Sequence, residues 1–262
     1  MLYPRFSSFV LAWFLLCPRG ASSQNPNPHA AQPERPTIAT HAGTVEGGWF
    51  EIETGGELDR YSAHSNGVVF PFTLKLGLAS HLQLSLFGYG TRPQGANSVQ
   101  IGDVALGVKW RLFDDLPILD KFAILPSLKL PTGASSTGAG TGTVDASMLL
   151  ISSHELGAVE LDVNVGFTKR SGNGMETPKT ASFWTVSFGG PAVDSLGWVA
   201  ELFSYPGTSG LAGKTSVIAI LFGPTLTVRP WLVVDAGIIV PARGSQPLAL
   251  YLGGVWNIGR IW

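Results

Sequence analysis

The sequence contains too little charge for a typical soluble domain. Only 13 % of its 262 residues are Asp, Glu, Lys or Arg, whereas soluble domains carry about 25 %. It also lacks, beyond the N-terminus, a run of about 20 apolar residues that could form a membrane-spanning helix. Mean hydropathy is nevertheless positive, at +0.23. A closed β-barrel is the remaining way for such a chain to occupy a membrane, because its backbone polar groups pair between strands.

Cysteine is almost absent as well. The single cysteine, Cys17, lies in an N-terminal stretch with a positive start at Arg5, an apolar core over 6–17 and small residues at 21–23. This pattern predicts a cleaved signal peptide over residues 1–23. The mature chain would then contain no thiol, which excludes thiolate chemistry and fits export to the bacterial envelope, where thiols are oxidised.

The sequence also lacks the patterns of nucleic-acid binding and of catalysis. Net charge is −1 with a pI near 6.5 and no basic stripe, so we do not expect a nucleic-acid partner. No metal-ligand spacing is present, and the glycine-rich stretch 134–142, predicted to be a mobile external loop, precedes no helix that could hold a phosphate. No catalytic residue, metal or cofactor is therefore predicted. The histidines are expected only in the leader, a loop and two turns: His29, His41, His64, His81 and His154.

Alternating apolar and polar residues dominate the rest of the chain. Around Val104, Leu106, Val108 and Trp110, the intervening positions include Lys109. Such a period of two predicts a strand. Charges on one face and a continuous apolar row on the other are typical of a wall between water and lipid.

The same alternation predicts twelve strands, and therefore an all-β, antiparallel up-and-down transmembrane barrel over residues 43–262. The first and third strands look short. Connections alternate between long glycine-rich loops and short turns, although those near Asp115 and Asp194 are longer than ideal; this asymmetry, with an even strand number, places both chain ends in the periplasm. The expected strands are 48–54, 67–78, 82–89, 104–112, 122–130, 144–153, 159–168, 181–189, 198–205, 215–227, 231–240 and 248–262.

Aromatic residues are expected to form two interfacial girdles, as in outer-membrane barrels. The girdle at the turns would contain Trp110, Phe113, Phe122, Phe188, Trp198, Trp231 and Trp262, and the looser one Tyr89, Phe167, Trp184 and Tyr205. The terminal Trp262 resembles the signal read by the barrel-assembly machinery. We therefore expect that machinery, the outer-membrane bilayer and a small-molecule solute as partners.

Residues 24–42 form a separate leader, rich in Pro, Ala, Asn and Gln and without a period. This composition predicts a flexible segment. The sequence leaves open whether the leader lies outside the barrel or folds back into it.

Several segments resemble the family of outer-membrane transporters named for the MetA pathway of phenol degradation. The resemblance spans nearly all of the mature chain and implies a barrel and an envelope location, but no substrate. The segments that carry it are Arg35-Pro36, Lys75-Leu76-Gly77-Leu78, Gly102-Asp103, Leu106-Gly107, Lys109-Trp110-Arg111, Leu128-Lys129-Leu130-Pro131-Thr132-Gly133, Asn164-Val165-Gly166 and Glu201.

Charged side chains on the polar strand faces are the candidate functional residues. They would either line a route and set its selectivity or fill a narrow interior with ion pairs. Lys109, Arg111, Lys129, Asp103, Glu160 and Asp162 are the members we favour in either case. The full predicted lumen-lining set is Glu51, Glu53, Lys75, Asp103, Lys109, Arg111, Lys129, Asp145, Glu160, Asp162, Glu201 and Asp235.

The leading functional hypothesis is an outer-membrane channel that passes small molecules, hydrophobic or aromatic ones among them, by passive diffusion. The alternative is a plugged barrel with a structural or adhesive role and no transport activity. A soluble ligand-binding barrel would need the faces inverted, with the apolar side inward. An outer-membrane lipid hydrolase would need a Ser and a His together on the barrel wall.

Overall fold

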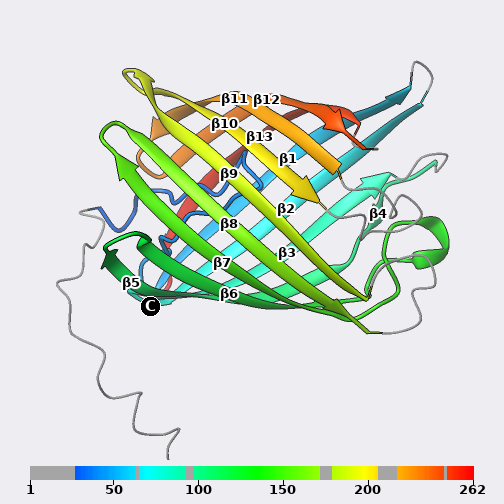
Figure 1. Ribbon diagram of the computed structural model, residues 1–262, viewed down its shortest axis with the longest axis horizontal. Coiled ribbons are helices and arrows are strands. Elements are labelled where there is room, and N and C mark those ends of the chain that lie inside the picture. Colours follow the sequence, from blue (N-terminus) through cyan, green and yellow to red (C-terminus); the bar gives the residue numbers. More distant parts are fainter. Residues whose placement is uncertain (1–26, 63–64, 93–96, 172–178, 206–216, 245–246) are drawn as a thin grey trace, which may run out of the picture.

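A computed structural model describes residues 27–62, 65–92, 97–171, 179–205, 217–244 and 247–262. Within these ranges, twelve long strands and the two-residue strand β4 form one antiparallel sheet (Figure 1). The strands are β1 (Trp49–Ser62), β2 (Ser65–Ala79), β3 (Leu82–Arg92), β4 (Gln100–Ile101), β5 (Val104–Leu116), β6 (Asp120–Leu130), β7 (Asp145–Leu156), β8 (Val159–Arg170), β9 (Thr180–Val193), β10 (Leu196–Tyr205), β11 (Val217–Arg229), β12 (Leu232–Arg243) and β13 (Leu248–Arg260).

The sheet closes into a barrel. Long strands that follow one another in the sequence pair throughout, with β3 pairing with β5 and the short β4 pairing only with β3. Because β1 also pairs with β13 and β2 pairs with β3, each long strand has a partner on both sides. The predicted twelve-stranded up-and-down barrel is therefore confirmed. The described residues contain no helix that is long and apolar enough to cross a membrane. A single 3₁₀ turn, η2 (Ser135–Thr137), interrupts the β6–β7 connection.

The strand faces have the polarity that the alternation predicts. On β5, Lys109 is fully buried, whereas Leu106 and Trp110 are exposed. Large apolar side chains are exposed around the wall, for example Phe222 and Leu252. The inverted arrangement that a soluble ligand-binding barrel would need is therefore not the one observed.

Several strands are longer than predicted. β1 continues from Thr54 to Ser62, where a loop was expected, because Gly55 and Gly56 break the apolar alternation but still pair with β13. β3 likewise continues to Arg92. The long turn expected around Asp194 is also wrong: β9 ends at Val193 and β10 begins at Leu196, since Asp194 adopts a left-handed conformation, φ 49°, that closes a tight turn.

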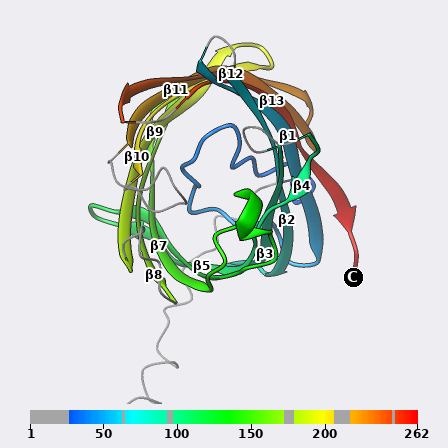
Figure 2. The same cartoon turned by 90° about the vertical axis from the view of Figure 1, so that its right-hand side faces the viewer.

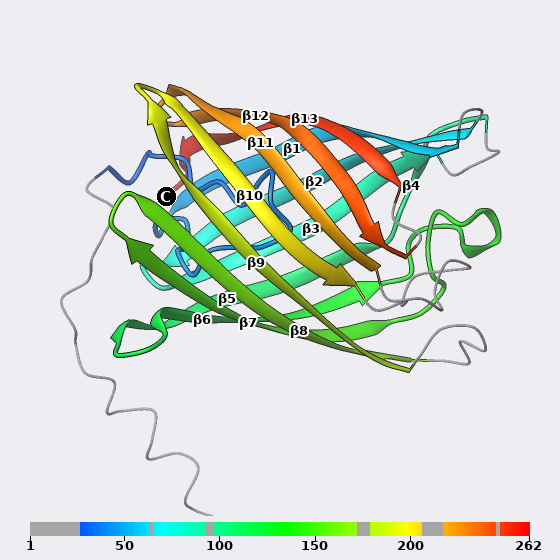
Figure 3. The same ribbon diagram turned by 45° about the horizontal axis from the view of Figure 1, so that its top comes forward.

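The two ends of the barrel differ. We call the end with the connections at 80–81, 117–119, 157–158, 194–195 and 230–231 the turn end, and the opposite end the loop end. The C-terminus and the first described residues of the leader lie at the turn end (Figures 1 and 3). Two tyrosines assigned to the looser aromatic girdle do not belong there. Tyr205 packs against Phe203 and Tyr89 bonds to the β6–β7 loop, so both face the interior.

The leader lies inside the barrel. Figure 2, viewed from the loop end, shows its blue trace within the ring of strands. Two apolar patches of the inner wall receive it: Ile38 packs against the cluster around Phe203 and Leu221, and Ala42 belongs to a cluster with Leu125 and Ile151. The question that the sequence left open is therefore answered in favour of the leader folding back. The proposed signal peptide, 1–23, falls outside the described residues.

Candidate functional site

The leader enters the barrel at the turn end through an aromatic contact. The His29 ring contacts the rings of Trp49 and Trp231, with centroid distances of 4.9 and 6.0 Å. Its Nε2 is 3.0 Å from the carbonyl oxygen of Asn257, and the Ala31 N–H donates to the Pro230 carbonyl at 2.8 Å. The first described residues of the leader are thus fastened to the barrel rim.

Inside the barrel, wall side chains bind the leader backbone. Because the leader joins no strand, its N–H groups need other acceptors, and polar side chains supply them. Asn164 is bonded in both directions, accepting from the Thr40 N–H and donating to the Thr40 carbonyl. The donor–acceptor pairs are Gln32 N to Glu51 (2.7 Å), Glu34 N to Glu53 (2.8 Å), Ile38 N and Ala39 N to Glu201 (2.8 and 2.7 Å), Thr40 N to Asn164 (2.8 Å) and Ala42 N to Ser153 (2.7 Å). Just after the leader, Val45 N donates to Gln83 in the same way, at 2.8 Å.

Two fully buried lysines connect the leader to the wall. Lys75 Nζ lies 2.7 Å from Glu51 and 2.5 Å from Glu53, and donates to the Gln32 carbonyl at 2.6 Å. Lys109 Nζ pairs with the Glu34 carboxylate. It also donates, at 3.0 Å each, to Thr40 Oγ1 and to the carbonyls of residues 41 and 43. Each buried charge is thereby paired and hydrogen-bonded, as burial requires.

Arg35 supplies a third charged anchor. Its Nη2 lies 3.1 Å from Asp235 Oδ1, and its guanidinium rests on Gly55 of β1 and Gly253 of β13. A Cβ atom on Gly253 would lie only 2.4 Å from Arg35 Nη2. The absence of side chains at both glycines makes the room that the guanidinium occupies.

Two titratable leader groups have shifted pKa values. Burial by itself would raise the pKa of Glu34, but the ammonium groups of Lys109 and Lys75 hold it well below its usual range. Burial, and then the nearby Lys109, lower the pKa of His41 from 6.5 to about 3. At neutral pH the docked leader therefore presents an ionised Glu34 and a neutral His41.

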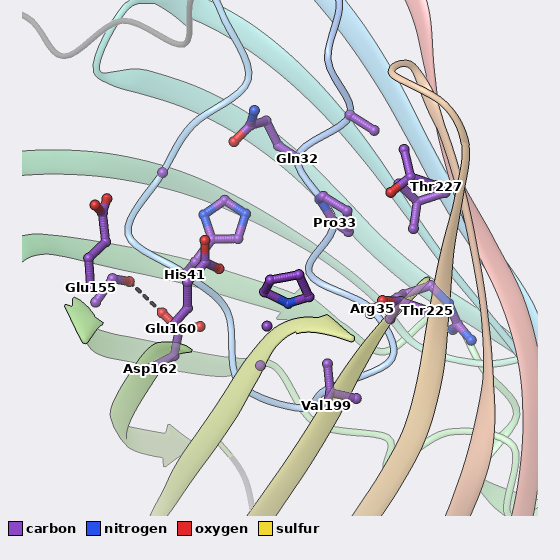
Figure 4. A pocket seen from close by; sticks show the side chains of 18 of the residues that line it. Gln32, Pro33, Arg35, His41, Glu155, Glu160, Asp162, Val199, Thr225 and Thr227 are labelled. Carbon is purple, nitrogen blue, oxygen red and sulfur yellow. Dashed lines mark hydrogen bonds between the residues drawn. The ribbon is translucent and has the colours of Figure 1, made fainter. Parts of the chain in front are cut away.

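The leader lies between two cavities. The turn-side cavity measures about 1070 Å³ and includes Arg35 and His41 of the leader among its lining. Figure 4 shows Glu155, Glu160 and Asp162 of β7 and β8 across from His41. The loop-side cavity measures about 560 Å³ and is lined by leader residues 34–40 and by the barrel wall toward the loop end. Arg35 of the leader contributes to the lining of both cavities.

Six of the twelve predicted charged residues contact the leader or pair with one another next to it. Three of the others, Asp103, Lys129 and Asp145, form a cluster at the loop end, where Lys129 Nζ lies 2.7 Å from Asp103 and 3.1 Å from Asp145. The group at the leader consists of Glu51, Glu53, Lys75, Lys109, Glu201 and Asp235.

The remaining three predicted charges lie toward the turn end. Arg111 pairs with Asp114 at 3.0 Å and is bonded to His81. Asp162 accepts from Ser153, and Glu160 is exposed to the turn-side cavity. Their roles in a route stay predictions.

Sequence reasoning missed the charges of the leader itself. Glu34 and Arg35 are the only Asp, Glu, Lys or Arg residues between positions 24 and 42. Two adjacent residues of opposite charge in an otherwise uncharged leader are a signal that could have identified the anchors. Glu57 and Asp59 were missed because the first strand was expected to end at Thr54.

The expectation that no histidine lies in a strand is wrong, because β7 extends past Ser153 and includes His154. Its Nε2 lies 2.9 Å from Ser152 Oγ. This pair does not resemble an activated nucleophile: the Ser152 hydroxyl donates to the Leu119 carbonyl at 2.8 Å and is buried. Its proton is therefore directed away from His154, and the imidazole must donate rather than accept.

The glycine-rich β6–β7 loop is tied down at the loop end. Asp103 accepts from the N–H groups of Gly133 and Thr141, at 3.1 and 2.9 Å, and Tyr89 Oη donates to the Ala139 carbonyl at 2.9 Å. Figure 2 shows η2 within the outline of the barrel mouth. The loop thus narrows the end of the barrel opposite the leader's entry.

Solved outer-membrane barrels share this fold. The COG4313 outer membrane channel from Pseudomonas putida F1 superposes with a TM-score of 0.60 over 82 % of this chain and 97 % of that chain, at 10 % identity. The KdgM porin gives 0.52 over 79 % and 99 %, also at 10 % identity. Both are channels rather than enzymes. No curated protein matches the chain.

A family model supplies the sequence relationship that these structural likenesses do not. It is described as "Putative MetA-pathway of phenol degradation" and matches residues 35–241, which include Arg35 of the leader and most of the barrel. The match covers well over half of the chain, and it agrees with the resemblance of the segments around Lys75, Lys109 and Lys129. The chain belongs to this MetA-pathway family of phenol degradation.

Proposed function

We propose that the protein is an outer-membrane channel through which small molecules pass by diffusion, and that the leader closes it. The observation that carries this proposal is the pair of cavities on the two sides of the leader. A barrel without a route would need no such spaces. The exposed apolar outer wall and the likeness to outer-membrane channels support the location in the outer membrane.

The leader's attachments favour a displaceable closure. They are hydrogen bonds and ion pairs to side chains, together with small apolar contacts, and no strand of the barrel pairs with it. Movement of the leader would therefore leave the sheet intact. In the same proposal, residues 1–23 are a signal peptide, and the barrel-assembly machinery inserts the chain.

The lining of the loop-side cavity supports small solutes with apolar or aromatic parts. Phe87, Tyr205, Leu221 and Ile239 are among its lining residues. Small-molecule sites are usually lined in this way, with few polar groups that fix orientation. The charges at Lys109 and Arg111 would set the ion preference once the leader has moved.

A plugged structural barrel is the second candidate, and one observation favours it. Lys75 and Lys109 are completely buried against carboxylates, and breaking such a pair costs about 3–5 kcal/mol. If nothing compensates for this cost, the leader stays in place and the barrel is closed.

A reversible cross-link between the leader and the barrel wall distinguishes the two candidate functions. Ala42 N lies 2.7 Å from Ser153 Oγ, so an Ala42→Cys/Ser153→Cys pair can be joined, by a disulfide or by a short bifunctional thiol reagent. The protein is reconstituted in liposomes, and swelling in small neutral and aromatic solutes is recorded with the pair joined and after release. The channel proposal expects permeation only after release.

Controls keep this experiment interpretable. Each single cysteine variant reports any effect of the substitutions themselves, and heat-modifiable gel mobility reports that the barrel is folded. Permeation that is equal in the joined and released states would show that the leader closes nothing. Folded protein that stays impermeable in both states, also when Lys109→Met weakens the leader's anchor, would favour the plugged barrel.

A further inference from the structure

The inner face of β1 carries four carboxylates, and only the two nearer the turn end form ion pairs with a cation. Glu51 and Glu53 share Lys75. Further toward the loop end, Glu57 and Asp59 form no ion pair with any residue in the described part of the chain. The side chains of Glu57 and Asp59 are hydrogen-bonded to each other, and Arg35 acts on Glu57 only at longer range. The loop-end half of β1 therefore brings an acidic pair without an ion-pair partner to the loop-side cavity, which both residues line.

Asp59 has unused hydrogen-bonding capacity. It is 5 % exposed, and apart from its contact with the Glu57 carboxyl group its Oδ1 has no hydrogen-bond partner in the structure. Its Oδ2 accepts from Tyr61 Oη at 3.3 Å, a long bond. A buried carboxylate oxygen without a partner costs free energy unless a ligand supplies a donor.

A second unused polar group lies in the same cavity. The Tyr251 side chain is 6 % exposed and lies against Gly223 and Gly237, where added Cβ atoms would meet its hydroxyl. That hydroxyl has no hydrogen-bond partner in the structure. Tyr251 belongs to β13, but its hydroxyl lies over Gly237 of β12 and Gly223 of β11, on the side away from β1.

The cation nearest to this region is already engaged. Arg35 lines the cavity from the leader, but its guanidinium pairs with Asp235 and is held over Gly55 and Gly253. The rest of the lining is largely apolar or aromatic and includes Phe87, Tyr205 and Leu221. The cavity thus combines unmatched carboxylates with walls that suit an apolar body.

We propose that the loop-side cavity binds small organic cations, an ammonium group on an aromatic or aliphatic body. The ammonium would donate to Asp59 and Glu57, and the body would lie against Phe87 and Tyr205, while Tyr251 would meet a polar group elsewhere on the ligand. Ammonium groups are also attracted to the faces of aromatic rings. The volume of about 560 Å³ falls within the roughly 300–1,000 Å³ typical of small-molecule sites. This substrate class rests on the proposed channel function, but binding can be measured without transport.

Three ligands with one carbon skeleton test the proposal: 2-phenylethylammonium, 2-phenylethanol and phenylacetate. Titration calorimetry of the whole protein in detergent, with binding to empty micelles subtracted, gives their affinities. We expect the ammonium to bind at least tenfold more tightly than the alcohol, and phenylacetate to bind most weakly. Asp59→Asn and Glu57→Gln should each weaken ammonium binding about tenfold and leave the alcohol unchanged. Asp115→Asn, which removes an equal charge from an exposed position, is the matched control.

Equal affinity for the three ligands would overturn the proposal, and so would an ammonium preference that survives both Asp59→Asn and Glu57→Gln. Both variants are made because the test needs only one of them to fold, and heat-modifiable gel mobility shows whether each is folded. Liposome swelling with Lys109→Met is scored separately. Ammonium-selective binding without permeation would refute the proposed channel function and support the binding site. Permeation without a preference for the ammonium would support the channel function and refute the binding site.

Discussion

Gly55 of β1 and Gly253 of β13 are register partners, and the space above the pair is occupied by the guanidinium of the leader's Arg35. Asp235, the register partner of Gly253 on β12, pairs with that guanidinium at 3.1 Å. Three strands of the wall thus provide one socket for one leader side chain. The leader therefore docks here because β1 and β13 have no side chain at Gly55 and Gly253, and because β12 carries the Asp235 carboxylate.

Gly253→Ala should therefore loosen the leader. The added methyl group would lie 2.4–2.6 Å from three guanidinium atoms, so Arg35 must move and leave Asp235 with a poorer partner, at a cost of about 1–3 kcal/mol. A cysteine placed at Ala39, which is 2 % exposed, reports release by its rate of maleimide labelling. We expect labelling to become roughly tenfold faster, since about 1.4 kcal/mol is a factor of ten.

The control for this substitution is Gly56→Ala, where the nearest atom to a new Cβ is at 3.6 Å. Labelling of Ala39→Cys should stay unchanged there. If Arg35 carries the effect, Gly253→Ala should add little in an Arg35→Ala background, because the two changes would then act on one contact. Fully additive effects on the labelling rate would contradict the interpretation that Gly253→Ala acts through Arg35.

Lys109→Met should release the leader more strongly. The substitution keeps the length and apolar character of the side chain but leaves the Glu34 carboxylate buried without its cation, which costs about 3–5 kcal/mol. Labelling of Ala39→Cys should rise by roughly 100-fold or more. Lys121→Met removes an ion pair whose partner Glu155 is largely exposed, and it should change labelling by less than about threefold.

The barrel itself should survive Lys109→Met, since β5 keeps its pairing with β3 and β6. Unchanged heat-modifiable mobility together with fast labelling is the expected combination. Slow labelling in a folded Lys109→Met protein would show that the buried ion pair does not hold the leader.

Acid should weaken docking through His41. Its pKa in the docked leader is about 3, against about 6.5 when it is free. A group whose docked pKa is lowered stabilises the docked state above its free pKa, and that stabilisation is lost as the pH falls below about 6.5. Between pH 7.5 and 5 the loss is at most about 2 kcal/mol, or roughly 30-fold in the released population. Glu34, whose pKa is held low, stays ionised throughout this window.

Single-channel opening recorded from pH 7.5 to 5 measures this effect without thiol chemistry. His41→Gln should flatten the part of the pH response that His41 causes, while Lys109, Glu34 and Lys75 still surround the site. A steep pH response that is the same in wild type and His41→Gln would place the responsible proton on another group.

The barrel was predictable because its signal is local and repeated. A period of two on β5 and β6 identifies strands, and the same period separates the buried Lys109 from the exposed Leu106. Strand ends were less predictable. Gly55 and Gly56 look like a loop in the sequence, and only pairing with β13 reveals them as strand.

The leader's position could not be read from its own residues. Its backbone is held by side chains more than 100 positions away, such as Asn164 and Glu201, and no local pattern encodes such contacts. Lys75, Lys109 and Asp235 lie on strands where the alternation expects a polar side chain, but their partners lie in the leader or on β1. Sequence spacing carries no information about these partners.

Asp103→Asn should free the β6–β7 loop at the loop end. Asp103 lies between β4 and β5, and its two oxygens accept from the Gly133 and Thr141 N–H groups, from Thr141 Oγ1 and from Lys129 Nζ at 2.7 Å. An amide keeps the shape but turns one acceptor into a donor, which would face either an N–H or the Lys129 ammonium. Hydrogen bonds to charged groups contribute about 1.5–3 kcal/mol, so the loop should open about 10–100-fold more often.

Cleavage by a protease of broad specificity measures that opening, because cutting of a transiently open segment follows the population of the open form. We expect faster cleavage within 131–144 in Asp103→Asn and wild-type rates in Asp115→Asn. Since this loop narrows the loop end, Asp103→Asn should also raise the conductance of a Lys109→Met channel, in which the leader no longer limits flow. Faster cleavage without a rise in conductance would mean that the loop lies beside the route rather than across it.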